Sequence, residues 1–337
     1  MKAVVMHGPA DVGIETISDP VRNPGEALLR VRRVGLCGSD LNSYRGRNPL
    51  VSFPRIPGHE VAATIVEIEE GHPNLAAGMD VTLSPYSSCG QCTSCRTGRS
   101  NACKNNQTLG VQRNGALAEY ITVPPENLYV ANLNLEELCL VEPLTVGCHA
   151  VARAEVTKKD TVAIVGCGGV GLGAVAASAF RGGRTIAMDV DDSKLAIARQ
   201  AGANHVIHTG RQDPAKVLSE LTGGAGPDVV IEAVGTPETF RAAVELVAFT
   251  GRVVYIGYAK EPVTYETRLF VQKELNILGA RNALTEDFRQ VIQMLEQHRF
   301  PVGAAISRLA PMDQAPELLR AWSAEPSKFT KIMLSLD

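Results

Sequence analysis

The segment from residue 160 to 281 alternates short apolar runs with longer helix-like stretches, and this alternation constrains the fold more than any other feature. Helical segments such as SKLAIARQAG lie between most of the runs. Strands connected in this way should form a parallel sheet covered on both faces, which indicates an α/β fold. The predicted strands are TVAIV (161–165), RTIAMD (184–189), HVI (205–207), DVVIEAV (228–234), RVVYIG (252–257) and LNILGA (275–280).

The first predicted strand ends in a glycine-rich turn, GCGGVG. Alone, this pattern can be a plain glycine turn, but after a strand and before a helix it is typical of a pyrophosphate site at a helix N-terminus. Asp189 ends the second strand about 20 residues later, where a carboxylate accepts hydrogen bonds from ribose hydroxyls. Val190 follows it, with no adjacent arginine for a 2′-phosphate, so NAD is favoured over NADP. The predicted cofactor-binding residues are Gly166, Gly168, Gly169, Val170, Gly171, Asp189 and Lys194.

The stretch CGQCTSCRTGRSNAC places four of the eight cysteines within a short segment. Four thiolates at about 2.3 Å satisfy a tetrahedral zinc ion and leave no open position, which is typical of a structural site. An iron–sulfur cluster is an alternative, but Ala102 and Lys104 flank the last cysteine where that pattern favours proline. Unliganded or disulfide-bonded cysteines are another. We expect a zinc lobe at 86–105 with the ligands Cys89, Cys92, Cys95 and Cys103.

Two other segments, GLCGSD and PGHE, carry potential ligands for a second metal ion. Cys37 and His59 are the ligand types that zinc prefers, and Glu60 or a later carboxylate could be the third ligand. Glu142 is the one acid in the otherwise apolar stretch CLVEPLTVGCHA, where an unpaired carboxylate would be costly. Each segment alone is weak evidence, since such residues are commonly core or surface residues.

Composition and charge limit the classes of partner. The 337 residues are 45% hydrophobic and carry a formal net charge of -3. This balance gives no electrostatic reason to expect nucleic acid or a membrane surface as partner, so a small molecule is the expected ligand. No stretch reads as a signal peptide or membrane span, and we expect a cytoplasmic protein. In that reducing compartment, clustered cysteines favour metal binding over disulfides.

Taken together, the motifs carry a family resemblance. The order Cys37-Gly-Ser39-Asp, Gly-His59-Glu60, the four-cysteine lobe, Glu142-Pro-Leu and GCGGVG resembles the zinc-dependent medium-chain dehydrogenases, and most closely their sorbitol dehydrogenase branch. The resemblance implies a GroES-like β-barrel catalytic domain at 1–147 and 282–337, interrupted by a Rossmann NAD-binding domain at 148–281. It also implies two zinc ions per chain, one catalytic and one structural.

The resemblance further implies how the catalytic residues act. Cys37 and His59 would ligate the catalytic zinc with Glu60 as third protein ligand, while Glu142 would hold the metal-bound water; related enzymes use the two acids differently. Ser39 would accept the proton of a secondary alcohol whose hydride passes to NAD+. One position departs from the family: where a histidine often completes the proton relay, this chain has Asn42, which cannot titrate near neutral pH.

The substrate is less well defined by the sequence. Arg45, Arg47 and Arg55 follow the first ligand segment, and Arg281 with Asn282 follows the last predicted strand. Arginine pairs with carboxylates, so these residues slightly favour a sugar acid over a neutral polyol such as sorbitol. The two segments also resemble a bacterial subgroup of the family that acts on hexonates, which implies L-galactonate or L-gulonate as the acid. The arginines could equally be solvated or paired with Glu67, Glu69 or Glu70.

Other classes of function remain open at this stage. One is an NAD-binding structural or sensing protein without turnover, and another is a thiol-dependent formaldehyde or glutathione-adduct dehydrogenase of the same fold. By the same resemblance we expect a homodimer or homotetramer that pairs through LNILGA.

Overall fold

The computed structural model describes residues 1–336, which divide into two compact units. The first unit comprises residues 1–142 together with the C-terminal segment from Val302 onward, and the second comprises Pro143–Pro301. The sequence had suggested 1–147 with 282–337 and 148–281. Residues 143–147 and 282–301 therefore belong to the second unit in the structure.

Packing explains why these residues join the second unit. Helix α3 (Leu135–Arg153) lies so close to α4 (Gly169–Phe180) that a side chain at Gly147 would collide with the α4 backbone. Helix α9 (Thr285–Glu296) packs on α4 and is tied to α3 by His149, whose Nδ1 lies 2.8 Å from Asp287 Oδ2. Tertiary contacts of this kind are not visible in the sequence pattern, which had assigned α9 to the other domain.

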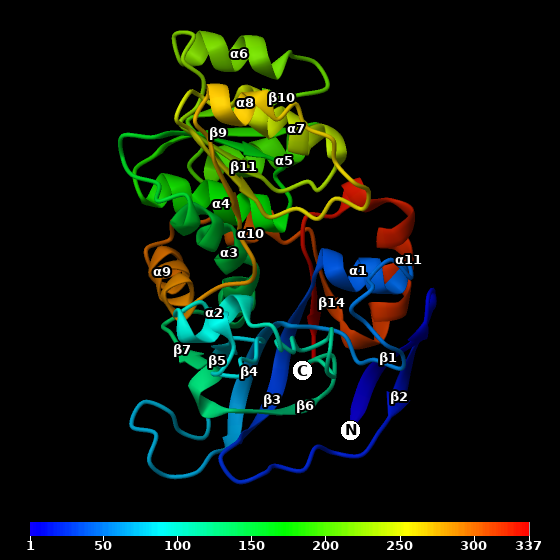
Figure 1. Cartoon of the computed structure of the whole chain (residues 1–337). Helices are drawn as coiled ribbons and strands as arrows, with labels where there is room; N and C mark the ends of the chain where they lie inside the picture. The colour runs from blue at the N-terminus through cyan, green and yellow to red at the C-terminus, as the bar shows by residue number, and fades with distance from the viewer. Residues whose placement is uncertain (337) are drawn as a thin grey trace. The chain divides into compact units, whose positions relative to one another are not determined.

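The second unit is built around a six-stranded parallel sheet (Figure 1). Its strand order is β10-β9-β8-β11-β12-β13, with neighbours in parallel register, and the six predicted strands are confirmed. The two central strands, β8 and β11, are almost wholly buried, as expected of apolar runs inside a covered sheet. The strands are β8 (Thr161–Val165), β9 (Arg184–Asp189), β10 (His205–His208), β11 (Val229–Glu232), β12 (Arg252–Tyr255) and β13 (Asn276–Gly279).

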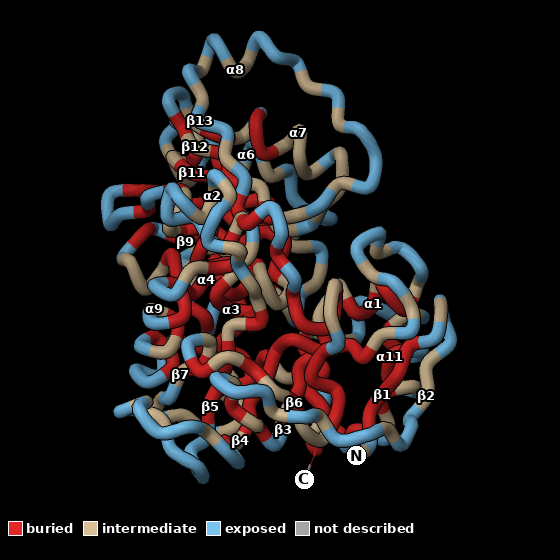
Figure 2. The backbone as a smooth tube through the Cα atoms, turned by 60° about the horizontal axis from the view of Figure 1, so that its bottom comes forward, coloured by how far each residue is buried: buried red, intermediate tan, exposed pale blue. Residues whose placement is uncertain are grey.

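Helices connect these strands, since parallel strands need long crossovers. Helix α4 packs on β8 and β9, α5 on β9 and β10, and α7 on β11 and β12. In Figure 2 much of the sheet is drawn red as buried, whereas the segment around α8 is mostly pale blue as exposed. The remaining helices of this unit are α5 (Asp192–Gln200), α6 (Pro214–Leu221), α7 (Pro237–Leu246) and α8 (Arg268–Gln272).

The first unit is mainly antiparallel and centred on the long strand β3 (Ala27–Leu36). Its main sheet has the order β14-β15-β3-β4-β5-β7, with β6 also paired to β3, and β1 and β2 form a separate hairpin. Strand β15 belongs to the C-terminal segment and pairs with β3. The other strands are β1 (Lys2–Gly8), β2 (Asp11–Thr16), β4 (Glu60–Glu67), β5 (Asp80–Leu83), β6 (Tyr120–Val123), β7 (Leu128–Val130), β14 (Arg308–Pro311) and β15 (Ile332–Ser335).

Short helices complete the first unit. Helix α1 (Gly38–Tyr44) follows β3 directly and packs on α11 (Ala315–Ala324). Arg45, just after α1, donates to the Ser323 hydroxyl at 3.1 Å and to the Ser323 carbonyl at 2.6 Å, which fixes this contact. The other helices are α2 (Thr93–Arg96) and α10 (Val302–Ala305).

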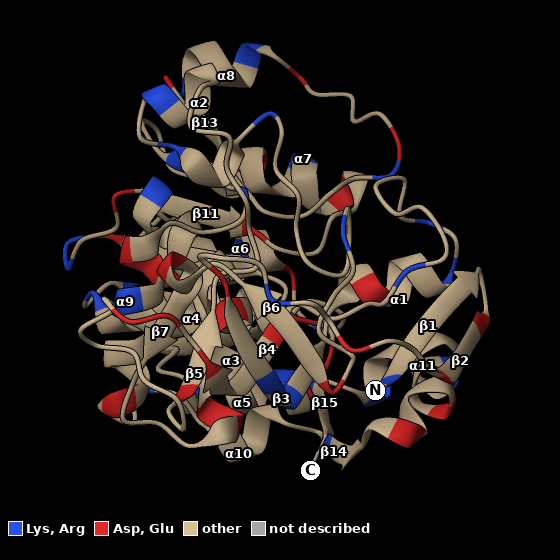
Figure 3. Ribbon diagram, turned by 90° about the horizontal axis from the view of Figure 1, so that it is seen from below, with Lys and Arg blue, Asp and Glu red and all other residues tan. Residues whose placement is uncertain are grey.

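Charged residues of both signs are spread over the two units (Figure 3). A few are buried instead, among them Asp40, Glu60, Glu142, Lys331 and Glu232, and these require partners. Within residues 1–336, no helix combines the length and the apolar character that crossing a bilayer requires.

Candidate functional site

The first candidate metal site forms where β3 ends and β4 begins. Cys37 follows β3 and precedes α1, while His59 comes just before Glu60, the first residue of β4. The two strands are antiparallel with Gly35 opposite Glu60, so these segments lie side by side. The Cys37 Sγ, a ring nitrogen of His59 and a carboxylate oxygen of Glu60 lie within 4.8 Å of one another. Residues distant in sequence thus form one cluster of zinc-type ligands.

The residues present fit a zinc ion. Thiolate, imidazole and carboxylate are the donor types that zinc accepts, and three protein ligands leave a position for substrate. His59 Nδ1 and Ser39 Oγ are buried without a hydrogen-bond partner among the described residues. Burial lowers the pKa of His59, but the negative charges of Cys37, Asp40 and Glu142 raise it well above its usual value. The surroundings therefore favour a positive charge at this place.

Asp40 joins the two ligand-bearing segments. It is 1% exposed, and its carboxylate accepts from the Cys37 backbone N–H at 2.8 Å and from the Gly58 backbone N–H at 3.3 Å. Its position directly after Ser39 is the sequence signal that could have indicated this role. Holding both segments, Asp40 fixes the separation of Cys37 and His59.

Glu142 lies near this cluster but outside the three-residue group. It is 3% exposed, and the Tyr86 hydroxyl donates to its carboxylate. Burial raises the pKa of Glu142, with His59 acting in the opposite direction. Sequence patterns did not indicate Tyr86. The assignment of Glu60 as ligand, with Glu142 beside it, remains a prediction.

Glu60 has a second partner that the sequence did not reveal. Lys331, immediately before β15, places Nζ 2.6 Å from both carboxylate oxygens of Glu60. Both side chains are buried, with 7% of Lys331 and 1% of Glu60 exposed. The lysine lies at the start of the apolar stretch of β15, where nothing in the local pattern indicates its partner.

The four cysteines of the predicted zinc lobe converge around α2. Their sulfur atoms lie within 4.8 Å of one another and form no disulfide. Backbone N–H groups point at the sulfurs, with Asn105 N 3.3 Å from Cys103 Sγ. Backbone hydrogen bonds from Cys95 and Lys104 lower the pKa of Cys92 to about 5. The fold thus presents four thiols, one of them readily ionised, as a closed site for a single metal ion.

The glycine-rich turn after β8 has the geometry of a phosphate-binding turn. Gly166 has a φ of 95°, a left-handed conformation that favours glycine. Gly171, in the first turn of α4, lies so close to the Gly166 carbonyl that a side chain would not fit. Asp189 accepts from the Cys167 backbone N–H at 2.7 Å, which ties the end of β9 to this turn. The N-terminus of α4, beginning at Gly169, is left facing a ligand position.

Glu232, the last residue of β11, organises the turn beside the glycines. It is wholly buried, and Oε1 accepts from Val234 N at 2.8 Å, Gly235 N at 2.7 Å and the Thr239 hydroxyl at 2.8 Å. The Val234 side chain and the Ala233 backbone lie directly against Gly166. In the sequence Glu232 is only one residue of a predicted strand, and nothing there indicates that it supports the turn.

The predicted substrate residues lie in different local surroundings. Arg45 is engaged by Ser323, whereas Arg47 is exposed on the turn after α1. Arg55 contacts Asn114 and Ser52. Arg281 is exposed and Asn282 half-buried in the second unit.

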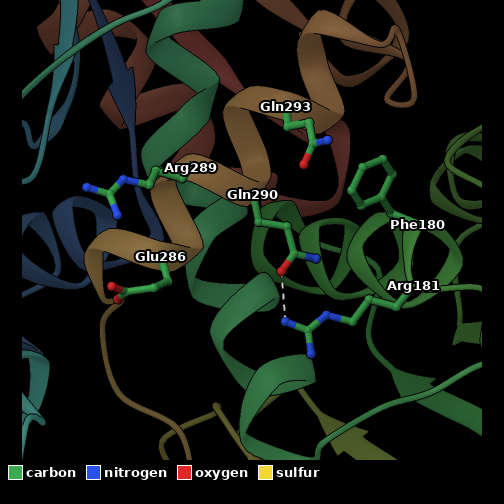
Figure 4. A pocket seen from close by; sticks show the side chains of 6 residues that line it. All are labelled: Phe180, Arg181, Glu286, Arg289, Gln290 and Gln293. Carbon is green, nitrogen blue, oxygen red and sulfur yellow. Dashed lines mark hydrogen bonds between the residues drawn. The ribbon is translucent and has the colours of Figure 1, made fainter.

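A hollow in the second unit, of about 530 Å³, lies between the end of α4 and α9 (Figure 4). Arg181 and Gln290 face each other there, joined by a hydrogen bond of 2.7 Å. None of the sequence-predicted site residues lines it, and its surface mixes acidic, basic and amide groups.

Comparison with known proteins agrees with these two units. A family model for an alcohol dehydrogenase GroES-like domain matches residues 23–133, and one for a zinc-binding dehydrogenase matches residues 169–297. The sorbitol dehydrogenase of Bacillus subtilis strain 168 is 35% identical over 287 residues, covering 83% of this chain and 81% of that protein. The chain belongs to the zinc-dependent medium-chain dehydrogenases.

Other members of the family are similar over almost the whole chain. The L-galactonate-5-dehydrogenase of Escherichia coli K12 is 28% identical over 312 residues, 92% of each chain. An alcohol dehydrogenase of E. coli CFT073, crystallised with NADH, has a TM-score of 0.91 at 27% identity over 100% of this chain and 99% of its own. A zinc-binding dehydrogenase of Sinorhizobium meliloti 1021, bound to NADP, has a TM-score of 0.91 at 27% identity over 99% and 98%.

These likenesses establish the class of reaction. The protein is a zinc-dependent alcohol oxidoreductase with a GroES-like unit and a Rossmann unit. The predicted family and fold class are confirmed.

The four-cysteine lobe generates a first prediction. Replacing Cys92 with alanine removes one thiolate of the closed set, so the chain should lose one zinc ion and melt at a lower temperature. Metal analysis and thermal unfolding measure both effects. Cys148→Ala is the control, because Cys148 is a buried thiol outside both metal-ligand groups. Full zinc content in Cys92→Ala would contradict the assignment.

A second prediction concerns Glu232. Glu232→Leu removes an acceptor shared by three donors and should raise the Kd for NADH by about tenfold, a loss of roughly 1.4 kcal/mol. Glu232→Gln keeps an acceptor oxygen and should bind NADH nearly as the wild type does. Fluorescence titration of NADH measures both, with the exposed Glu245→Leu on α7 as control. Unchanged binding by Glu232→Leu would show that the turn needs no support from this carboxylate.

Proposed function

We propose that this dehydrogenase oxidises a secondary alcohol group of a polyol with NAD+ and catalyses the reverse reduction of the ketone. The observation that carries the proposal is the cluster of Cys37, His59 and Glu60 at the junction of β3 and β4. These residues would hold a zinc ion, which supplies a Lewis acid that lowers the pKa of an alcohol. When bound, NAD+ would supply the acceptor for the hydride of the alcohol carbon.

Ser39 is the proposed proton relay: its hydroxyl oxygen would accept the alcohol proton while its own O–H proton passes to a water molecule. It follows Cys37 by two residues, and its buried hydroxyl oxygen has no hydrogen-bond partner among the described residues. That oxygen is therefore available to a substrate hydroxyl. Asn42, on the same helix, can position a hydroxyl or a water molecule by hydrogen bonding but cannot itself carry the proton away.

Charge near the end of β9 supports NAD as the cofactor. Asp189 would accept the ribose hydroxyls, while Asp191 and Asp192 add negative charge to the same turn. The nearby Arg211 is already paired with Asp192 at 2.8 Å. A 2′-phosphate would therefore meet carboxylates rather than a free arginine. Gly166, Gly168, Gly169, Val170, Gly171 and Lys194 complete the proposed cofactor site.

For the substrate, a neutral polyol is the first candidate. Arg45, the arginine nearest to α1, is bound by Ser323, which removes one of the groups that had favoured a carboxylate. The likeness to a sorbitol dehydrogenase supports this choice. A hexonate is the second candidate, because Arg47 is exposed on the turn after α1 and an L-galactonate-5-dehydrogenase is also similar.

The substrate proposal predicts how fast the enzyme oxidises each member of a panel of hexitols, pentitols and hexonates. NADH formation at 340 nm should be faster with hexitols and pentitols than with hexonates and should stop on zinc chelation. NAD+ should be preferred to NADP+ by at least about tenfold, the factor that 1.4 kcal/mol of charge repulsion produces. Arg47→Ala should leave polyol oxidation unchanged, as should the exposed control Arg320→Ala.

Two results of this panel would overturn parts of the proposal. Turnover of hexonates alone, with a raised KM in Arg47→Ala, would establish the sugar-acid alternative. No turnover of any substrate by zinc-loaded, NADH-binding protein would contradict the proposed reaction itself.

We also expect a homo-oligomer. Strand β13 is an outer strand of its sheet and Ile277 on it is 40% exposed, so a second copy could extend the sheet. Light scattering after size exclusion should give a multiple of the 35.9 kDa chain mass. Ile277→Lys should weaken the assembly, whereas Val21→Lys, 81% exposed in the other unit, should not. A wild-type monomer would contradict this expectation.

A further inference from the structure

Lys331 and Glu60 form a buried ion pair beside the proposed catalytic metal site. Nζ of Lys331 lies 2.6 Å from both oxygens of the Glu60 carboxylate and 3.3 Å from the Leu36 carbonyl. Leu36 directly precedes Cys37, a proposed metal ligand. The lysine therefore contacts one candidate ligand and the residue next to another.

The strand register leaves a space over Gly35 in which this ion pair lies. Ile332, next to Lys331, pairs with Leu36 on one side of β3, and Glu60 pairs with Gly35 on the other. The two side chains meet over Gly35. A Cβ on Gly35 would collide with Glu60 Oε2 and lie 3.1 Å from Glu60 Cβ, so only glycine leaves this space open.

The ion pair competes with a metal ion for the same atoms. The carboxylate oxygens that face Lys331 are also the atoms that Glu60 offers to the metal cluster. An ammonium group draws on their lone pairs and brings a positive charge close to the position of the cation. Both effects weaken Glu60 as a ligand.

From this geometry we infer that Lys331 is a positioning residue that holds Glu60 over Gly35, weakens its bond to the catalytic metal and thereby keeps a coordination position open for substrate. The inference rests on the proposed function, since it assumes the metal site at Cys37 and His59. Gly35 and Lys331 would together help to set the affinity of the catalytic site for its metal ion.

A purely structural ion pair would behave differently. Removing one partner of a buried pair destabilises a protein because the other charge is left uncompensated. If the pair only stabilised the fold, its loss would lower stability to the same extent with and without metal. If Lys331 competes with the metal, its loss should instead strengthen metal binding.

The test measures zinc affinity in charge-changing variants. Zinc-stripped protein is titrated with Zn²⁺ against a chromophoric chelator, and the two sites are fitted separately. Lys331→Met should bind zinc at the catalytic site about tenfold more tightly or better, because it loses the competing charge. Lys331→Arg retains the charge and should stay near the wild-type value. Lys328→Met, 64% exposed and paired with Glu325, is the control and should match the wild type.

A second measurement, the melting temperature with and without zinc, covers the case in which a variant folds poorly without metal. The rise in melting temperature on adding zinc should be larger in Lys331→Met than in the wild type, because zinc then compensates an otherwise unpaired carboxylate. Lys331→Gln, which keeps a hydrogen-bond donor but no charge, should shift zinc affinity in the same direction.

Three outcomes are separable. Equal or weaker zinc binding by Lys331→Met and Lys331→Gln would overturn the inference. Equal shifts in the Arg and Met variants would also overturn it, because charge would then not be the cause. A wild-type chain that binds zinc only at the four cysteines would instead refute the catalytic metal site, and with it the proposed function.

Discussion

The antiparallel pairing of β3 with β4 is the constraint on which the proposed catalytic centre depends. It sets Gly35 opposite Glu60 and so brings the end of one strand, with Cys37 beyond it, next to His59 at the start of the other. A one-residue slip would turn every side chain of β4 to the opposite face. The register is thus inseparable from the ligand cluster, and the buried apolar residues of both strands enforce it.

Around this pairing, the first unit buries several ionisable groups. Asp40, His59, Glu60, Glu142 and Lys331 are all less than a tenth exposed. Four of them are held by a neighbour: backbone N–H groups bind Asp40, the Tyr86 hydroxyl binds Glu142, and Lys331 and Glu60 bind each other. Such an arrangement is costly without compensation, and a bound cation at Cys37 and His59 would balance its remaining negative charge.

The sequence predicted the regular parts of the structure well. Apolar runs bounded by glycines and polar residues located the strands of the parallel sheet; β8 and β9 have the predicted limits. The spacing of the four cysteines located a cluster within one short segment. Each of these signals lies within a short segment, so it can be recognised from one amino-acid sequence without knowledge of the fold.

Contacts between distant segments escaped the same reasoning. Lys331 and Tyr86 show no periodicity that would connect them to Glu60 and Glu142, and Glu232 looks like any acid at the end of a strand. The role of Arg45 in holding α11 depends on a helix that lies far along the chain. The domain limit was placed at residue 147 rather than 142, because the packing of α3 on α4 is a tertiary effect.

The most direct test of the central claim is anomalous diffraction at the zinc edge from crystals of the zinc-loaded protein. We expect two peaks per chain, one bonded to the four cysteines and one bonded to Cys37 and His59, with sulfur at about 2.3 Å. A single peak at the four cysteines, with Cys37 and His59 unligated, would contradict the proposed catalytic centre.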